Sequence, residues 1–153
     1  MYASDIKLSD GIAVSYYAYH NHRAKVEPLV SMVKKAVPEY RKLLNFGKVT
    51  IRIAPLKGIV RGRYWDSTSV VEIDSRLDPA IAIETLAHEL VHAEQYHTGR
   101  LEQRKVNGKW MRSWQGEMIK MSKSYEAYRA LPWEAEAFGR QVELASAVRE
   151  LVF

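Results

Sequence analysis

Residues 78–99, DPAIAIETLAHELVHAEQYHTG, decide the fold, because they describe one helix that carries three of the five histidines in the 153-residue chain. Asp78 is a suitable N-cap. Pro79 fits the first helical position, because an N–H there would have no hydrogen-bond partner within the helix. Gly99 follows the apolar pattern and favours the end of a helix. We therefore predict a helix over residues 79–97.

Two of these histidines stand at helical spacing around a glutamate. His88 and His92 are four residues apart, so on a helix they lie ~6 Å apart along the axis and ~40° apart in rotation. Glu89 lies beside the pair, where its carboxylate suits a base better than a metal ligand. Leu86 and Leu90 point away, so the helix should bury an apolar side and present the histidines toward a cleft. This HExxH pattern is typical of zinc peptidases.

A third ligand must come from elsewhere in the chain. On a continuous helix His97 lies ~180° from His88, and a glycine that would turn the chain back toward the metal is replaced by Gln95. The chain has no cysteine, and no histidine follows His97. A catalytic zinc site with three protein ligands therefore requires a carboxylate. The candidates are Glu102, Glu117, Glu126, Glu134, Glu136, Glu143 and Glu150.

Glu134 and Glu136 open the last predicted helix on different faces. Glu134 is in line with the apolar side, whereas Glu136 shares the polar side with Arg140. A carboxylate on an inward face is costly unless it is paired or coordinated, which favours Glu134 as a ligand. The alternative is an ordinary first-turn glutamate that the helix dipole stabilises.

The HExxH helix and the EAEA stretch at 134–137 resemble the gluzincin group of zinc metallopeptidases, in particular minimal ImmA/IrrE-like and phage-type members. The resemblance implies a zincin-like fold and a Zn²⁺ cofactor held by His88, His92 and Glu134. It also implies hydrolysis of a protein or peptide substrate, with Glu89 as the general base. The chain departs from the related pattern at Phe138, where Asn or Asp is usual, so a partner that orients a ligating histidine is missing or comes from elsewhere.

The remaining patterns predict one domain over residues 1–153, of α+β class with a small mixed sheet. Strands are expected at 12–18, at 49–53 and within 62–74, because apolar and polar residues alternate there. A helix is expected from about Val26 to Leu44, which Pro38 should break or kink.

Two further elements complete the prediction. Asn107-Gly108 predicts a β-hairpin insert over about 100–119. A C-terminal helix, which carries the third ligand, should begin at Pro132. Its expected apolar side consists of Phe138, Val142, Ala145, Val148 and Val152.

Other residues are candidates for contacts with the substrate. Tyr125, Tyr128 and His97 are available to stabilise an oxyanion. The predicted strand with Arg63, Tyr64 and Trp65 can bind an extended peptide along its edge.

The composition leaves two alternative functions open. The net charge of +5 and the basic and aromatic residues of KWMRSWQ (109–115) are compatible with a nucleic-acid-binding module, the less favoured partner. A metal-bound but non-catalytic binding protein of the same fold would retain every ligand. The N-terminus lacks the pattern of a secretory signal and no stretch reaches the ~20 apolar residues of a membrane span, so we expect a cytoplasmic protein without a membrane partner.

Overall fold

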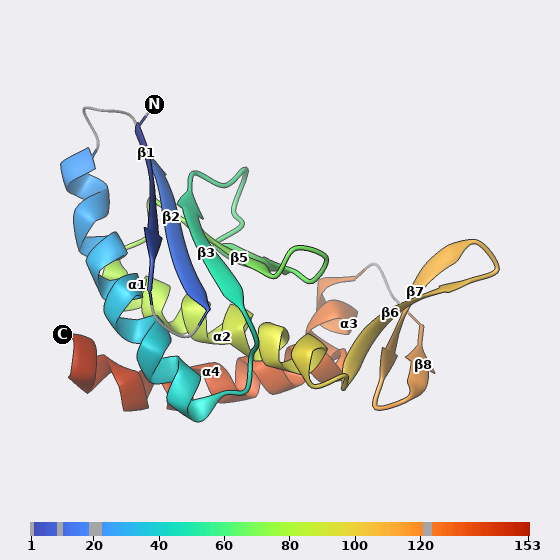
Figure 1. Ribbon diagram of the computed structural model, residues 1–153. Coiled ribbons are helices and arrows are strands. Elements are labelled where there is room, and N and C mark those ends of the chain that lie inside the picture. Colours follow the sequence, from blue (N-terminus) through green and yellow to red (C-terminus); the bar gives the residue numbers. More distant parts are fainter. Residues whose placement is uncertain (1, 9–10, 19–22, 121–123) are drawn as a thin grey trace.

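The computed structural model describes residues 2–8, 11–18, 23–120 and 124–153 (Figure 1). Within these ranges the chain is a mixed α+β protein with four helices, a five-stranded mixed sheet and a three-stranded sheet. The elements are β1 (Tyr2–Lys7), β2 (Ile12–Ala18), α1 (Arg23–Leu43), β3 (Val49–Ala54), β4 (Gly62–Trp65), β5 (Val70–Asp74), α2 (Pro79–His97), β6 (Leu101–Val106), β7 (Lys109–Trp114), β8 (Glu117–Ile119), α3 (Tyr125–Ala130) and α4 (Pro132–Val152).

The larger sheet has the strand order β1-β2-β3-β5-β4, with β2, β3 and β5 parallel and the two edge strands antiparallel to their neighbours. The strands predicted at 12–18 and 49–53 are confirmed. Residues 62–74 form two strands, because the chain turns back at Ser69, whose φ is 55°, and Trp65 pairs with Val70. The sequence patterns do not predict β1.

One face of this sheet carries the core. Val49, Ile51 and Ile53 of β3 are buried, whereas Arg52 on the opposite face is exposed. α1 packs against β2, α2 packs against β4 and β5, and α4 packs mainly against α1 and α2. The helices therefore cover the apolar face of the sheet in two layers, and α2 lies between the sheet and α4 (Figure 1).

The first helix is longer than predicted and continues through Pro38. Val33, Val37 and Tyr40 on both sides of this proline are fully buried. A proline inside a helix costs about 3 kcal/mol, which the burial of several large side chains outweighs. Of the two effects predicted for Pro38, a break and a kink, the break is therefore wrong.

The bounds predicted for α2 are confirmed. Oδ1 of Asp78 accepts a hydrogen bond of 2.9 Å from the N–H of Ala80, and Gly99 adopts a φ of 75° just beyond the helix. Leu86 and Leu90 are buried, as expected. The side that carries the histidines is also buried, because α4 packs against it, so α2 has no broadly exposed face in its central turns.

β6, β7 and β8 form an arm that projects from the main body (Figure 1). The predicted hairpin is confirmed: Asn107 and Gly108 both have positive φ, 50° and 77°, as a tight two-residue hairpin turn requires. A second turn at Gln115 and Gly116 adds β8, which was not expected. At its base the arm packs through Leu101 in a small apolar cluster around Trp133, separate from the main core.

α4 begins at Pro132 as predicted and is preceded by the short helix α3, which the patterns do not indicate. Ala145 and Val148 are buried as expected, but Val142 is 57% exposed. Val142 lies ~80° around the helix from Glu134, outside the side that contacts α1 and α2. None of the helices in the described ranges is long and apolar enough to cross a bilayer.

Candidate metal centre

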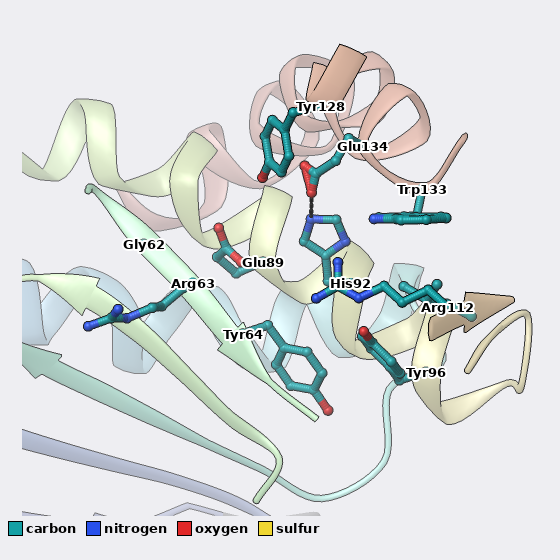
Figure 2. Close-up of a pocket in the computed structure, with 11 residues that line it drawn as sticks. Gly62, Arg63, Tyr64, Glu89, His92, Tyr96, Arg112, Tyr128, Trp133 and Glu134 are labelled. Carbon is teal, nitrogen blue, oxygen red and sulfur yellow. Dashed lines mark ion pairs between the residues drawn. The ribbon is translucent and has the colours of Figure 1, made fainter. Parts of the chain in front are cut away.

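His88 and His92 of α2 meet Glu134 in the first turn of α4, where the two helices pack together. The Nε2 atoms of the histidines are 3.2 Å apart. Glu134 places one oxygen 2.6 Å from Nε2 of His92 (Figure 2) and the other 3.5 Å from Nε2 of His88. The structure therefore brings together the three residues that the sequence indicates as ligands, and all three are buried.

Two glutamines orient the histidine rings. Nδ1 of His92 is 2.8 Å from Oε1 of Gln95, and Nδ1 of His88 is 2.8 Å from Oε1 of Gln141. An amide oxygen accepts hydrogen bonds, so each Nδ1 donates its proton. In a neutral ring the Nε2 lone pair is then available to a cation, whereas a protonated His92 donates from Nε2 to Glu134. Phe138, at the position where a polar partner is usual, instead packs edge-on against the His88 ring at 4.6 Å between centroids. The partners that orient the two histidines are thus Gln95 and Gln141.

This arrangement fits a cation. Three electron-donating groups converge, and Oε2 of Glu134 is buried without a hydrogen-bond partner. Ligand atoms ~2.0–2.1 Å from a tetrahedral ion lie about 3.3 Å from one another, close to the 3.2 Å that separates the two Nε2 atoms. A buried group of two histidines and one glutamate with this geometry can hold a metal ion.

The electrostatics of the site favour positive charge at the same point. Burial alone would raise the pKa of Glu134, but its close contacts with the His88 and His92 rings outweigh burial and hold that pKa well below its usual range. Burial would lower the pKa of His92, yet the hydrogen bond with Glu134 and the negative charge of Glu89 raise it. A positive charge between the imidazoles and the carboxylate is therefore stabilised, whether a proton or a metal ion supplies it.

Glu89 lies beside the three ligands but is not one of them. Its side chain is buried between α2 and β4, and burial raises the pKa of its carboxyl. Gly62 of β4 makes this proximity feasible, because a Cβ there would lie 2.7 Å from Cγ2 of Thr85 and 3.3 Å from Cγ of Glu89. The glycine lets the edge strand run close to the face of α2 that carries Glu89.

A pocket of about 200 Å³ opens onto Glu89, His92 and Glu134 (Figure 2). Of the three candidates for oxyanion stabilisation, Tyr128 lines this pocket, and its hydroxyl interacts with Glu134. Tyr125, which is 67% exposed, lies at a neighbouring hollow on the His88 side.

His97 is not part of this site. It lines a neighbouring pocket with Gly47 and Lys48, and its position ~180° around α2 from His88 directs it away from the candidate metal ligands. Tyr64 lines both pockets, but the structure does not place His97 with the candidate metal ligands, with Glu89 or with Tyr128.

The predicted substrate strand is β4, at the free edge of the larger sheet. Arg63 and Tyr64 line the pocket, as does Gly62. Trp65 does not: its indole N–H donates to Glu72, on the neighbouring strand. Two of the three strand residues are thus at the site.

Four further pocket residues are not among the predicted site residues: Tyr96, Leu101, Arg112 and Trp133. Of these, Arg112 is predicted only as part of the basic and aromatic stretch 109–115. Tyr96 follows His92 by four residues and shares its helix face, a signal that could have identified it. Arg112 and Trp133 have no such signal, because their position depends on how the arm packs against the start of α4.

Glu136 is held in a network of ion pairs rather than free in solvent. Its carboxylate lies 2.6 Å from Arg100 and 3.6 Å from Arg140, and it accepts a hydrogen bond of 3.2 Å from Gln95. Gln95 also donates to the carbonyl of Trp133 at 3.0 Å. The amide that orients His92 is therefore fixed on both sides.

Comparison of the chain with models of protein families, with curated proteins and with solved structures finds no match.

Proposed function

We propose that the protein is a zinc-dependent peptide hydrolase with a zincin-like fold of the gluzincin type. The observation that carries the proposal is the convergence of His88, His92 and Glu134 beside Glu89 in one pocket. Two imidazole nitrogens and one carboxylate are a recurrent ligand set of catalytic zinc, which leaves the fourth position open. The paired glutamine partners support metal binding, because ligating histidines almost always donate their other N–H to an oxygen.

Bound zinc would supply a Lewis acid that polarises a carbonyl group and makes water acidic enough to attack it. Glu89 takes the proton of the attacking water. Its carboxyl pKa is raised by burial, which makes the carboxylate a stronger base, and the side chain lines the pocket with His92. Glu89 then returns the proton to the leaving amine.

Tyr128 is the residue best placed to stabilise the oxyanion. Its hydroxyl lies in the pocket near Glu134, and burial raises its pKa well above the usual value, so it stays a hydrogen-bond donor at neutral pH. Tyr125 contacts the Tyr128 ring at 6.5 Å between centroids and supports its position.

The peptide would bind along β4. This strand pairs with β5 on one side only, so its other edge offers backbone groups to an extended peptide. Gly62 and Tyr64 place that edge at the wall of the pocket that holds Glu89.

The test combines metal analysis with one substitution. The wild-type protein should bind one zinc ion per chain and cleave unfolded protein or peptide pools, with new termini detected by mass spectrometry. Glu89→Gln should retain the zinc and lose the cleavage, because the amide cannot accept a proton. A wild type that binds zinc tightly but cleaves nothing in such pools would support the non-catalytic alternative instead.

The nucleic-acid alternative receives less support from the arm. Trp114 packs at 6.4 Å from the Trp133 ring and so belongs to the small apolar cluster. Of the two tryptophans in KWMRSWQ, only Trp110 is largely exposed, at 68%.

A further inference from the structure

Arg112 places an unpaired positive charge in the metal pocket. It lies on β7, the central strand of the arm, and lines the pocket that also reaches His92 and Glu134 (Figure 2). The side chain is half-buried, and its guanidinium carbon lies 5.8 Å from the centre of the Trp133 ring. Stacking on an indole holds a guanidinium in place and leaves its N–H groups free to donate.

Neighbouring arginines have carboxylate partners, whereas Arg112 has none among the residues that the structure describes. Arg63, also at the pocket, pairs with Glu72 at 3.1 Å. Arg100, at the base of the arm, pairs with Glu136 at 2.6 Å. A partly buried guanidinium without an anion is a costly arrangement, and a ligand carboxylate would relieve that cost.

With a divalent metal bound, the net charge of the pocket would favour an anionic ligand. Glu89 and Glu134 each contribute one negative charge and Arg112 contributes one positive charge, while the charge of Arg63 is neutralised by Glu72. With a divalent ion the sum is +1, and one carboxylate of the substrate brings it to zero. The pocket, at about 200 Å³, is smaller than the ~300–1,000 Å³ of a typical small-molecule site and is suited to one side chain of a longer ligand.

A second hollow continues from Arg112 along the arm. It is lined by Gln103 and Trp110, which share one face of the sheet with Arg112 because Gln103 pairs with Arg112 across the strands and Trp110 is two residues away. Lys105 lies over the Trp110 ring at 5.8 Å, so this face stays basic toward its tip. A peptide that leaves the metal pocket on this side meets positive charge and an exposed aromatic ring.

We propose that Arg112 determines specificity by binding a substrate carboxylate, so the substrate is a peptide with an acidic group beside the scissile bond. This inference rests on the proposed function for the location of the scissile bond. The carboxylate is either an Asp or Glu side chain within the peptide or a free C-terminus. A guanidinium binds both in the same bidentate manner.

The test separates binding from hydrolysis. The probes are acetylated octapeptide pools in which one position at a time is fixed as Glu, Gln or Lys and the others are uncharged mixtures. Each pool is made with an amidated and with a free C-terminus. Retention on immobilised, zinc-loaded Glu89→Gln protein is measured by mass spectrometry, and cleavage by the wild-type protein is measured on the same pools. Zinc content and thermal stability are checked for every variant.

We expect about tenfold enrichment of Glu over Gln at one position, the range of one charge-assisted bidentate contact. Arg112→Gln should remove this preference, Arg112→Lys should retain part of it, and Arg112→Glu should favour Lys. Arg104→Gln is the matched control, because Arg104 lies on the other face of the arm and already pairs with Glu102 at 3.0 Å. If enrichment depends only on the free C-terminus, the carboxylate is terminal.

Three results would overturn the inference. They are the absence of any acid preference, a preference that Arg112→Gln leaves intact, and an equal loss of binding for all pools in Arg112→Gln, which would indicate a contact with the peptide backbone. Acid-selective binding without cleavage would support the subsite and contradict the hydrolase proposal. Cleavage without acid selectivity would support the hydrolase proposal and contradict the Arg112 subsite.

Discussion

Replacement of Gln141 by leucine should weaken zinc binding without unfolding the protein. Gln141 accepts from Nδ1 of His88 at 2.8 Å and makes one further, longer contact to Glu84 at 3.3 Å. Leucine has a similar volume but cannot accept a hydrogen bond, so the His88 ring loses the contact that fixes its tautomer. Loss of such an outer contact lowers metal affinity about 10- to 100-fold, equivalent to about 1.4–2.7 kcal/mol.

The assay is a zinc titration against a chromophoric chelator at constant pH, with urea unfolding of the zinc-free protein in parallel. The free energy of unfolding should change by less than about 1 kcal/mol, because Gln141 is only half-buried. Glu143→Gln on the exposed face of the same helix is the control and should leave zinc affinity unchanged. An affinity within twofold of the wild type in folded Gln141→Leu protein would refute the assigned role.

Further outcomes follow from other contacts. Glu134→Ala should weaken zinc by at least about 100-fold in the same titration, because it removes a ligand. Glu136→Ala should lower stability by about 1–3 kcal/mol in urea unfolding, since it breaks a half-buried network, while zinc affinity stays within about threefold. Gly62→Ala should reduce both stability and cleavage, because its Cβ would meet a methyl group of α2 at 2.7 Å. Burial would raise the pKa of Asp74, but hydrogen bonds from Arg76 lower it. The stability that this carboxylate contributes is thus fully present above about pH 4 and declines as the pH falls through the lowered pKa, so Asp74→Asn should destabilise the protein at pH 7 and have a smaller effect at pH 3 in urea unfolding.

The sequence is most informative where function depends on one regular helix. The positions of His88 and His92 follow from the 3.6-residue period alone, and Asp78 and Gly99 set the ends of α2 through local chemistry. The inward direction of Glu134 likewise follows from the phase of α4. These predictions need no knowledge of how the elements pack.

Features that depend on packing between distant elements are those that the patterns miss. Gln141 is seven residues after Glu134 and on the same helix face, yet its role is visible only once α4 lies against His88. Arg112 enters the pocket because the arm is anchored at Trp133, a contact that no local pattern encodes. Val142 is the opposite case, because the apolar pattern predicts burial and the residue is exposed. It lies near the edge of the apolar face of α4, where the neighbouring helices do not cover it.

The position of Glu134 in the last helix has a consequence for the order of events during synthesis. Two ligands lie on α2, and the third lies 42 residues later, so a nascent chain presents an incomplete site until residues 132–152 have emerged and docked. Until α4 docks, His88 and His92 lack the carboxylate that Glu134 places beside them in the folded protein. If the protein binds the proposed metal ion, the site is completed by the docking of α4, and metal affinity would be coupled to the packing of this helix.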